Sequence, residues 1–123
     1  MTYTLEDWRA AVTNLIKKTS KKEISWELTD VFSVDVWTEV DRSFSCDLKN
    51  RTYVVSATRK RHYLDEVEYY WEHGFSFSIH KFGLGGYIKL ASAPEGLNAV
   101  ESLFSLAEAS YAYSQNALGD LLE

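Results

Sequence analysis

The sequence predicts one α+β domain in which two helical segments enclose a block of antiparallel strands. Apolar residues recur with helical spacing in residues 4–18 and again from Leu97 to the C-terminus. Between these segments, apolar and polar residues alternate with the two-residue period of half-buried strands. The chain has 123 residues, the usual size of one domain. We therefore expect residues 1–123 to form a single domain, with a meander-like sheet of five to six strands and both helical segments packed on it.

The helix at the N-terminus has recognisable start and end signals. Thr4 and Asp7 stand three residues apart, as in a helix capping box, and lysines from Lys17 onward complement the carboxyl end of the helix. The C-terminal segment follows Pro94, is interrupted near Gly119 and is rich in small residues. Small side chains permit close approach to the sheet or to another chain, so a homodimer is compatible with the sequence.

Six segments between the helices have the alternation expected of strands: residues 24–28, 32–40, 44–48, 52–58, 75–80 and 87–91. Turns are expected around Lys49–Asn50 and at the glycine-rich residues 83–86. Residues 63–72 fit either a short helix or a strand. Their aromatic and β-branched content favours a strand, with His73–Gly74 as the tight turn that follows it.

The composition indicates where in the cell the protein is expected and which class of partner it can bind. The N-terminus lacks a secretion signal, and no apolar run approaches the ~18 residues of a membrane span, so we expect a cytoplasmic protein without membrane contact. All 13 Lys and Arg residues lie at or before Lys89, and the net charge of -5 therefore comes from the last third of the chain. This distribution argues against direct nucleic-acid binding by the C-terminal helix and is compatible with a partner that has a basic surface.

No motif for catalysis, a metal or a cofactor is present. The histidines (His62, His73 and His80) lack metal-ligand spacing, and Cys46 is isolated in a predicted strand, where a core role is expected. The glycines of residues 83–86 precede a strand, whereas a phosphate-binding loop precedes a helix. We therefore expect no catalytic residue, no metal and no cofactor. The alternative is an enzyme whose site is assembled from unpatterned residues, with His73 approaching His80 across a hairpin.

Two sets of residues remain as candidate binding sites. The first combines aromatic and acidic residues, the types expected at a protein-binding hot spot: Asp35, Trp37, Glu39, Glu66, Glu68, Tyr70 and Glu72. In this set Trp37 faces outward from the sheet, unless one of the helices covers it. The second is an alternative basic site for a phosphate, RNA or an acidic protein surface: Arg59, Lys60, Arg61 and His62.

These observations favour a non-enzymatic protein-interaction module. Within that class we expect a small cytosolic inhibitor that binds and occludes a partner protein. A toxin-immunity protein and a phage-encoded inhibitor of a host defence complex, such as an anti-CRISPR, are two examples of this class. The alternatives are a binding protein that resembles a secretion chaperone, and a small-ligand or nucleic-acid binder that uses the Arg59–His62 basic cluster.

Overall fold

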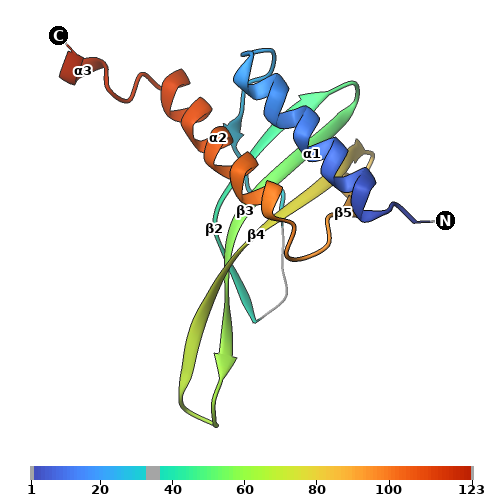
Figure 1. Ribbon diagram of the computed structural model, residues 1–123, viewed down its shortest axis with the longest axis vertical. Helices are drawn as coiled ribbons and strands as arrows, with labels where there is room; N and C mark the ends of the chain where they lie inside the picture. The colour runs from blue at the N-terminus through green and yellow to red at the C-terminus, as the bar shows by residue number, and fades with distance from the viewer. Residues whose placement is uncertain (1, 33–36, 123) are drawn as a thin grey trace.

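The fold is an open antiparallel sheet of five strands with both long helices on one of its faces (Figure 1). The computed structural model describes residues 2–32 and 37–122. In chain order the elements are α1 (Leu5–Ser20), β1 (Glu27–Leu28), β2 (Thr38–Leu48), β3 (Arg51–Tyr63), β4 (Tyr69–Gly83), β5 (Gly86–Ser92), α2 (Asn98–Ser114) and α3 (Gly119–Leu122). The strands lie in the order β1-β2-β3-β4-β5, so the predicted α+β class and the meander are confirmed.

Local signals explain where the helices begin and end. Thr4 and Asp7 form the predicted capping box: Thr4 Oγ1 accepts from the Asp7 amide at 3.1 Å, and the Thr4 amide donates to Asp7 Oδ2 at 2.9 Å. At the other end of the chain, α2 stops at Ser114, and Asn116 has a positive φ of 54°. This turn separates α2 from α3. None of the described helices is long and apolar enough to cross a membrane.

The core lies between the two helices and the sheet. It is built from buried residues of α1, α2 and the central strands, among them Trp8, Val12, Leu15, Phe44, Val55, Phe77, Leu103 and Phe104. Aromatic rings join the layers: Trp8 meets Phe77 edge to face at 6.1 Å, and Phe44 lies 5.5 Å from Phe104. The predicted role of Cys46 is confirmed, because the cysteine is buried in this cluster.

The first three expected strands differ from the observed ones. The strand expected over residues 24–28 is reduced to Glu27–Leu28. The strands expected over 32–40 and 44–48 are joined in β2, which begins at Thr38. The pairing with β3 shifts between Val40 and Arg42, and such a bulge inserts one residue that reverses the alternation of side chains. Glu39 therefore lies on the same face as Phe44, whereas a regular strand would place the two on opposite faces.

The prediction of a tight turn at His73–Gly74 is wrong. Leu64 donates its amide to the Glu68 carbonyl at 2.8 Å, so the chain reverses at residues 64–68, and β4 continues through His73 and Gly74 without a break. Asp65 fixes this turn, because its carboxylate accepts from the amides of Val67 and Glu68 at 2.8 and 2.7 Å. The strand expected over 63–72 is therefore wrong over residues 64–68, which form the turn; Tyr63 ends β3, and only residues 69–72 belong to β4.

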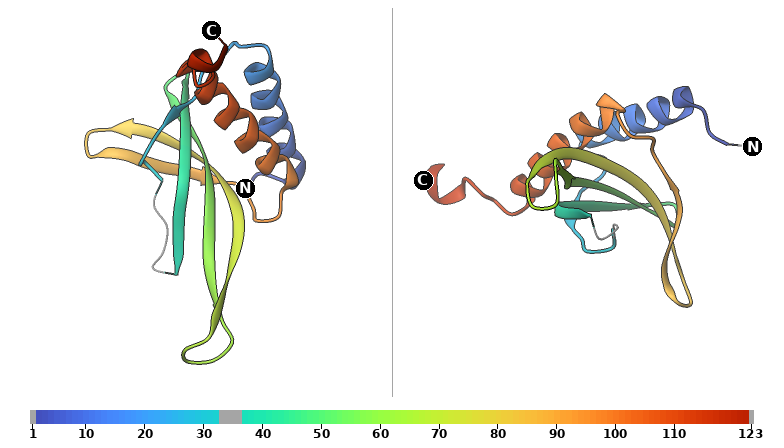
Figure 2. Two further views of the ribbon diagram at one scale, coloured as in Figure 1. Left: turned by 90° about the vertical axis from the view of Figure 1, so that its left-hand side faces the viewer. Right: turned by 90° about the horizontal axis from the view of Figure 1, so that it is seen from below.

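The β3–β4 hairpin extends well past the helices (Figures 1 and 2). We call residues 59–73 the arm; within it the two strands pair in one register, from Arg59↔His73 to Tyr63↔Tyr69. The hydrophobic core and the side chains packed against it reach Ala57 and Phe75 and include no residue of the arm. The arm is thus an extension of the sheet that the core does not require.

Candidate functional site

The helix-bearing face of the sheet continues along the arm as a surface of aromatic and arginine side chains. We call this the aromatic–arginine surface, and its residues are Trp37, Glu39, Arg59, Arg61, Tyr63, Tyr69 and Trp71. The register explains the grouping. Ala57↔Phe75 faces the helices, and the pairs Arg59↔His73 and Arg61↔Trp71 follow on the same face at two-residue spacing.

The aromatic rings of this surface form a continuous series of contacts. Trp37 meets Tyr63 edge to face at 6.3 Å, Tyr63 lies 5.5 Å from Tyr69, and Tyr69 meets Trp71 edge to face at 5.6 Å. These separations are those of favourable ring pairs. The rings are consequently held in fixed positions relative to one another, although they lie outside the core.

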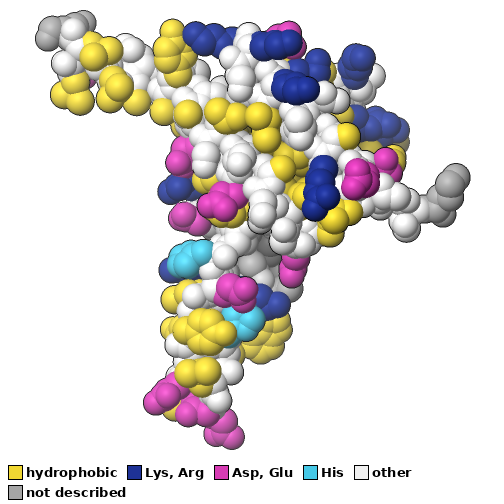
Figure 3. Space-filling model, viewed as in Figure 1, with side chains coloured by type: hydrophobic (Ala, Val, Ile, Leu, Met, Phe, Trp, Pro, Cys, Tyr) yellow, Lys and Arg dark blue, Asp and Glu magenta, His cyan; other side chains and the backbone are white. Residues whose placement is uncertain are grey.

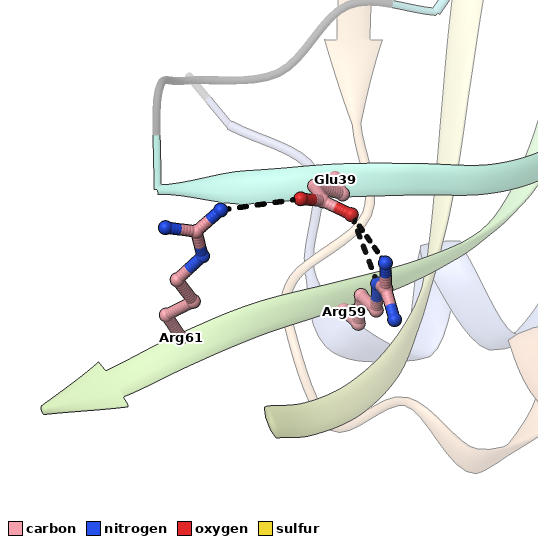
Figure 4. Close-up of polar contacts among 3 residues, drawn as sticks. All are labelled: Glu39, Arg59 and Arg61. Carbon is pink, nitrogen blue, oxygen red and sulfur yellow. Dashed lines mark hydrogen bonds and ion pairs between the residues drawn. The ribbon is translucent and has the colours of Figure 1, made fainter. Parts of the chain in front are cut away.

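The two arginines are held between one carboxylate and the rings. Arg59 donates from Nε and Nη2 to Glu39 Oε2 at 3.0 and 2.6 Å, and Arg61 donates from Nη2 to Glu39 Oε1 at 3.4 Å (Figure 4). The Arg59 guanidinium lies 4.2 Å from the centre of the Trp71 ring, and that of Arg61 lies 5.1 Å from the same ring. Hydrogen bonding from Arg59, followed by the charges of both arginines, lowers the pKa of Glu39.

Much of this aromatic surface is open to solvent. Trp37 is 56% exposed, and Tyr63 and Tyr69 are each 45% exposed. Of the two alternatives left open for Trp37, an outward position or cover by a helix, the structure shows the exposed one, but by a different geometry. The side chain is on the helix-bearing face and stays exposed because the helices do not reach the arm. A contiguous exposed aromatic patch is uncommon on a protein without a partner for it.

The opposite face of the arm has a smaller polar cluster. His62 Nε2 contacts the Glu72 carboxylate, and the His62 ring stacks on Tyr70 at 5.3 Å with an interplanar angle of 16°. Lys60 precedes them on the same face, by strand alternation. On this face, too, a residue of the predicted acidic set, Glu72, pairs with a residue of the predicted basic set, His62.

The tip of the arm is acidic. Asp65, Glu66 and Glu68 lie in the turn, and Figure 3 shows acidic side chains gathered at this end of the molecule below hydrophobic ones. The amides of Glu68 and Val67 donate to Asp65 and lower its pKa. Glu66 and Glu68 were expected on one face of a strand; the turn instead places them at the tip.

Residues of the two sets predicted as alternatives thus meet where β2 lies beside the arm and within the arm itself. Glu39 of the acidic set pairs with Arg59 and Arg61 of the basic set, and Glu72 pairs with His62. Asp35 lies outside the described residues. Sequence reasoning did not include Tyr69 and Trp71, although their alternation with Tyr70 and Glu72 was visible, because it placed the turn after them.

The alternative of a site formed by His73 and His80 is contradicted by the structure. Both residues belong to β4, seven residues apart, which corresponds to roughly 23 Å along an extended strand. His73 is exposed, whereas His80 is buried on the other face, where its Nε2 lies 2.8 Å from Ser78 Oγ. Ser78 is fully buried as well, so this serine and histidine pair is shielded from solvent.

We predict that His80 makes stability depend on pH. Burial, and secondarily the charge of Lys89, lowers the pKa of His80 in the folded protein. Because the unfolded chain binds a proton more readily, this contribution to stability is complete above the ordinary pKa near 6.5 and is lost as pH falls through the folded pKa. Urea unfolding between pH 7.5 and 5 should show a fall in the free energy of unfolding that is smaller in His80→Gln. Equal pH dependence in both proteins would contradict this prediction.

The cysteine does not offer reactive chemistry. Burial, with a smaller effect of the Asp47 charge, raises the pKa of Cys46 to about 12. The thiolate is the nucleophilic form, and at neutral pH this group stays a neutral thiol. Within residues 2–32 and 37–122, no three His, Cys, Asp or Glu side chains are grouped as metal ligands.

Comparison of the chain with protein-family models, curated proteins and solved structures found no match.

Proposed function

We propose that this protein is a non-enzymatic protein-binding module that contacts its partner with the arm. The observation that carries this proposal is the exposed aromatic–arginine surface on an element that the core does not require. Trp, Tyr and Arg are the residues most enriched at binding hot spots. Their ordering by ring contacts and by Glu39 reduces the conformational entropy lost on association.

A protein partner fits this surface better than a nucleic acid does. Stacking of a base needs an open ring face, but the Arg59 guanidinium already lies over Trp71 at 4.2 Å. The carboxylates of Asp65, Glu66 and Glu68 at the tip would repel phosphates. The same tip suits a basic patch on a partner protein, as expected from the sequence.

A small folded body with one projecting arm is suited to occlusion of a partner's cleft. We therefore propose the inhibitor class expected from the sequence, which includes immunity proteins and phage-encoded inhibitors of host defence complexes. In this proposal the arm enters the cleft, and the helices and the rest of the sheet hold it in place.

The experiment is affinity capture from the native host with three baits: the wild-type protein, Trp71→Ala and Tyr87→Ala. Tyr87 is the control, because it is an aromatic residue on β5, outside the arm, and is about as exposed as Tyr63 and Tyr69 of the arm. We expect the wild-type protein and Tyr87→Ala to capture the same protein, and Trp71→Ala to lose it. Equal capture by Trp71→Ala, or a captured species removed by nuclease, would show the proposal to be wrong.

A further inference from the structure

One edge of β4 has no strand beside it over the length of the arm. β5 pairs with β4 from Gly83 only as far as Ser78, and one further bond joins the Ala93 amide to the Phe77 carbonyl at 2.8 Å. β3 occupies the other side of β4 throughout. Among the described residues, none pairs with Tyr69–Ser76 on the β5 side.

The register shows which backbone groups lie along this edge. The Glu68 carbonyl bonds to Leu64, so even-numbered residues of β4 direct their backbone groups toward β3. The Phe77 carbonyl points to the β5 side, and backbone direction alternates along a strand. The amides and carbonyls that face outward therefore belong to Tyr69, Trp71, His73 and Phe75.

There is room beside this edge for another segment of chain. A cavity of about 1030 Å³ reaches this edge, where His73, Phe75 and Ser76 of β4 and Ala93 and Leu97 of the connection to α2 line it; its other part is lined by β2 and β3 residues such as Thr38, Thr58 and Lys60. The sequence of Tyr69–Ser76 also lacks the proline and lysine with which proteins commonly protect an exposed edge. Only an extended backbone satisfies such a row of donors and acceptors.

A second copy of this chain is a poor occupant. If two β4 edges paired antiparallel, the tip of each arm would lie beside the inner end of the other. This would bring Asp65, Glu66 and Glu68 toward Glu95 and Glu101, which line the cavity. The lining there also includes one base, Lys89, but the acidic groups outnumber it, so electrostatic repulsion favours a different partner.

The side chains beside the edge indicate what the added segment carries. The guanidiniums of Arg59 and Arg61 both lie over Trp71, and their ion pairs within the described chain end on the same carboxylate, that of Glu39. Neighbouring strands place facing side chains about 5 Å apart. A carboxylate on the added strand opposite Trp71 would therefore meet a surface with more positive than negative charge.

We propose that the partner adds an extended segment to the β4 edge, pairing with Tyr69, Trp71, His73 and Phe75 and presenting a carboxylate beside Trp71. This inference rests on the proposed function, since it specifies how the arm binds a protein. It goes further by assigning the main-chain groups of β4, in addition to the side chains of the arm, as the binding element.

The test uses dodecapeptides selected from a random phage-displayed library on the immobilised full-length protein, then synthesised. Their affinities are measured for wild type, His73→Pro, His73→Ala and Trp71→Ala. Proline at 73 removes an outward amide that β3 does not use, and edge strands tolerate this change. We expect His73→Pro to lose about 30-fold or more in affinity, and His73→Ala to bind nearly as well as wild type.

A second measurement leaves the protein unchanged and modifies the peptide. In an added strand only every second peptide amide faces β4, so N-methylation of those amides should abolish binding, whereas N-methylation of the amides between them should not. Selected peptides should also be enriched in Asp or Glu.

Unchanged affinity of His73→Pro, binding insensitive to N-methylation, or failure to select any peptide would overturn the inference. If His73→Pro binds normally while Trp71→Ala does not, strand addition is wrong and the proposed function stands. If neither His73→Pro nor Trp71→Ala weakens binding, both the strand addition and the proposed function are wrong. A wild-type dimer that His73→Pro dissociates would identify a second copy as the occupant, against the inference.

Discussion

Trp71→Ala is expected to weaken binding of the captured partner by about 2 kcal/mol, or about 30-fold, which is typical of a hot-spot tryptophan. The ring is contacted by Arg59, Arg61 and Tyr69, so its removal takes away the support of both guanidiniums as well as its own contact area. Stability should change little, because no residue of the arm belongs to the core. Calorimetric titration of the partner gives the affinity, and thermal unfolding checks the fold.

The control for this change is Tyr87→Ala, which removes an exposed ring from the β4–β5 end of the sheet. Its affinity should remain within about threefold of wild type, a difference of less than 1 kcal/mol. Equal losses in Trp71→Ala and Tyr87→Ala would show that the effect is not specific to the arm.

Trp26→Ala is expected to cost about 3–5 kcal/mol of unfolding free energy, the range for removing a buried aromatic side chain. Trp26 has no exposed surface, and its Nε1 donates to Thr19 Oγ1 at 2.9 Å. That hydroxyl donates in turn to the Leu15 carbonyl at 2.7 Å, so the indole connects α1 to the chain entering the sheet. The cavity left by the indole adds to the lost transfer free energy.

Urea unfolding of Trp26→Ala and of Trp37→Ala makes a matched comparison of two tryptophans. Trp37 is 56% exposed, and its replacement should cost under about 1 kcal/mol. A loss for Trp26→Ala as small as that for Trp37→Ala would contradict the position of Trp26 in the core.

Much of the fold could be predicted because its signals are local. The capping box at Thr4 and Asp7 and the turn at Lys49–Asn50 each act over a few residues, and both are present. Asn50 has the positive φ of 70° that such turns require and that asparagine tolerates.

The errors came from features that depend on pairing between distant residues. The bulge after Val40 can be recognised only from the register against β3. The turn at Asp65 was overlooked because His73–Gly74 has a stronger local turn signal, yet Gly74 pairs with Thr58 inside the sheet. Long-range pairing outweighed local preference at that point.

The candidate site, like the fold, could be predicted only in part. Trp37, Glu39, Arg59 and Arg61 were recognised as residue types suited to binding, but in two separate sets. Their proximity follows from the pairing Glu39↔Arg59, a contact between residues 20 positions apart that composition cannot indicate. The sequence therefore identified several components of the surface without showing that they form one surface.

The arm can be removed while the body is kept, and this tests the central claim most directly. Lys60 of β3 and Glu72 of β4 are paired residues whose backbone amides and carbonyls point toward each other. Replacing residues 61–71 by Asn-Gly should therefore join the two strands there by a two-residue hairpin turn. The shortened protein should unfold at nearly the wild-type temperature and show no measurable affinity for the partner captured by the wild-type protein. Retention of wild-type affinity by the shortened, folded protein would contradict the central claim.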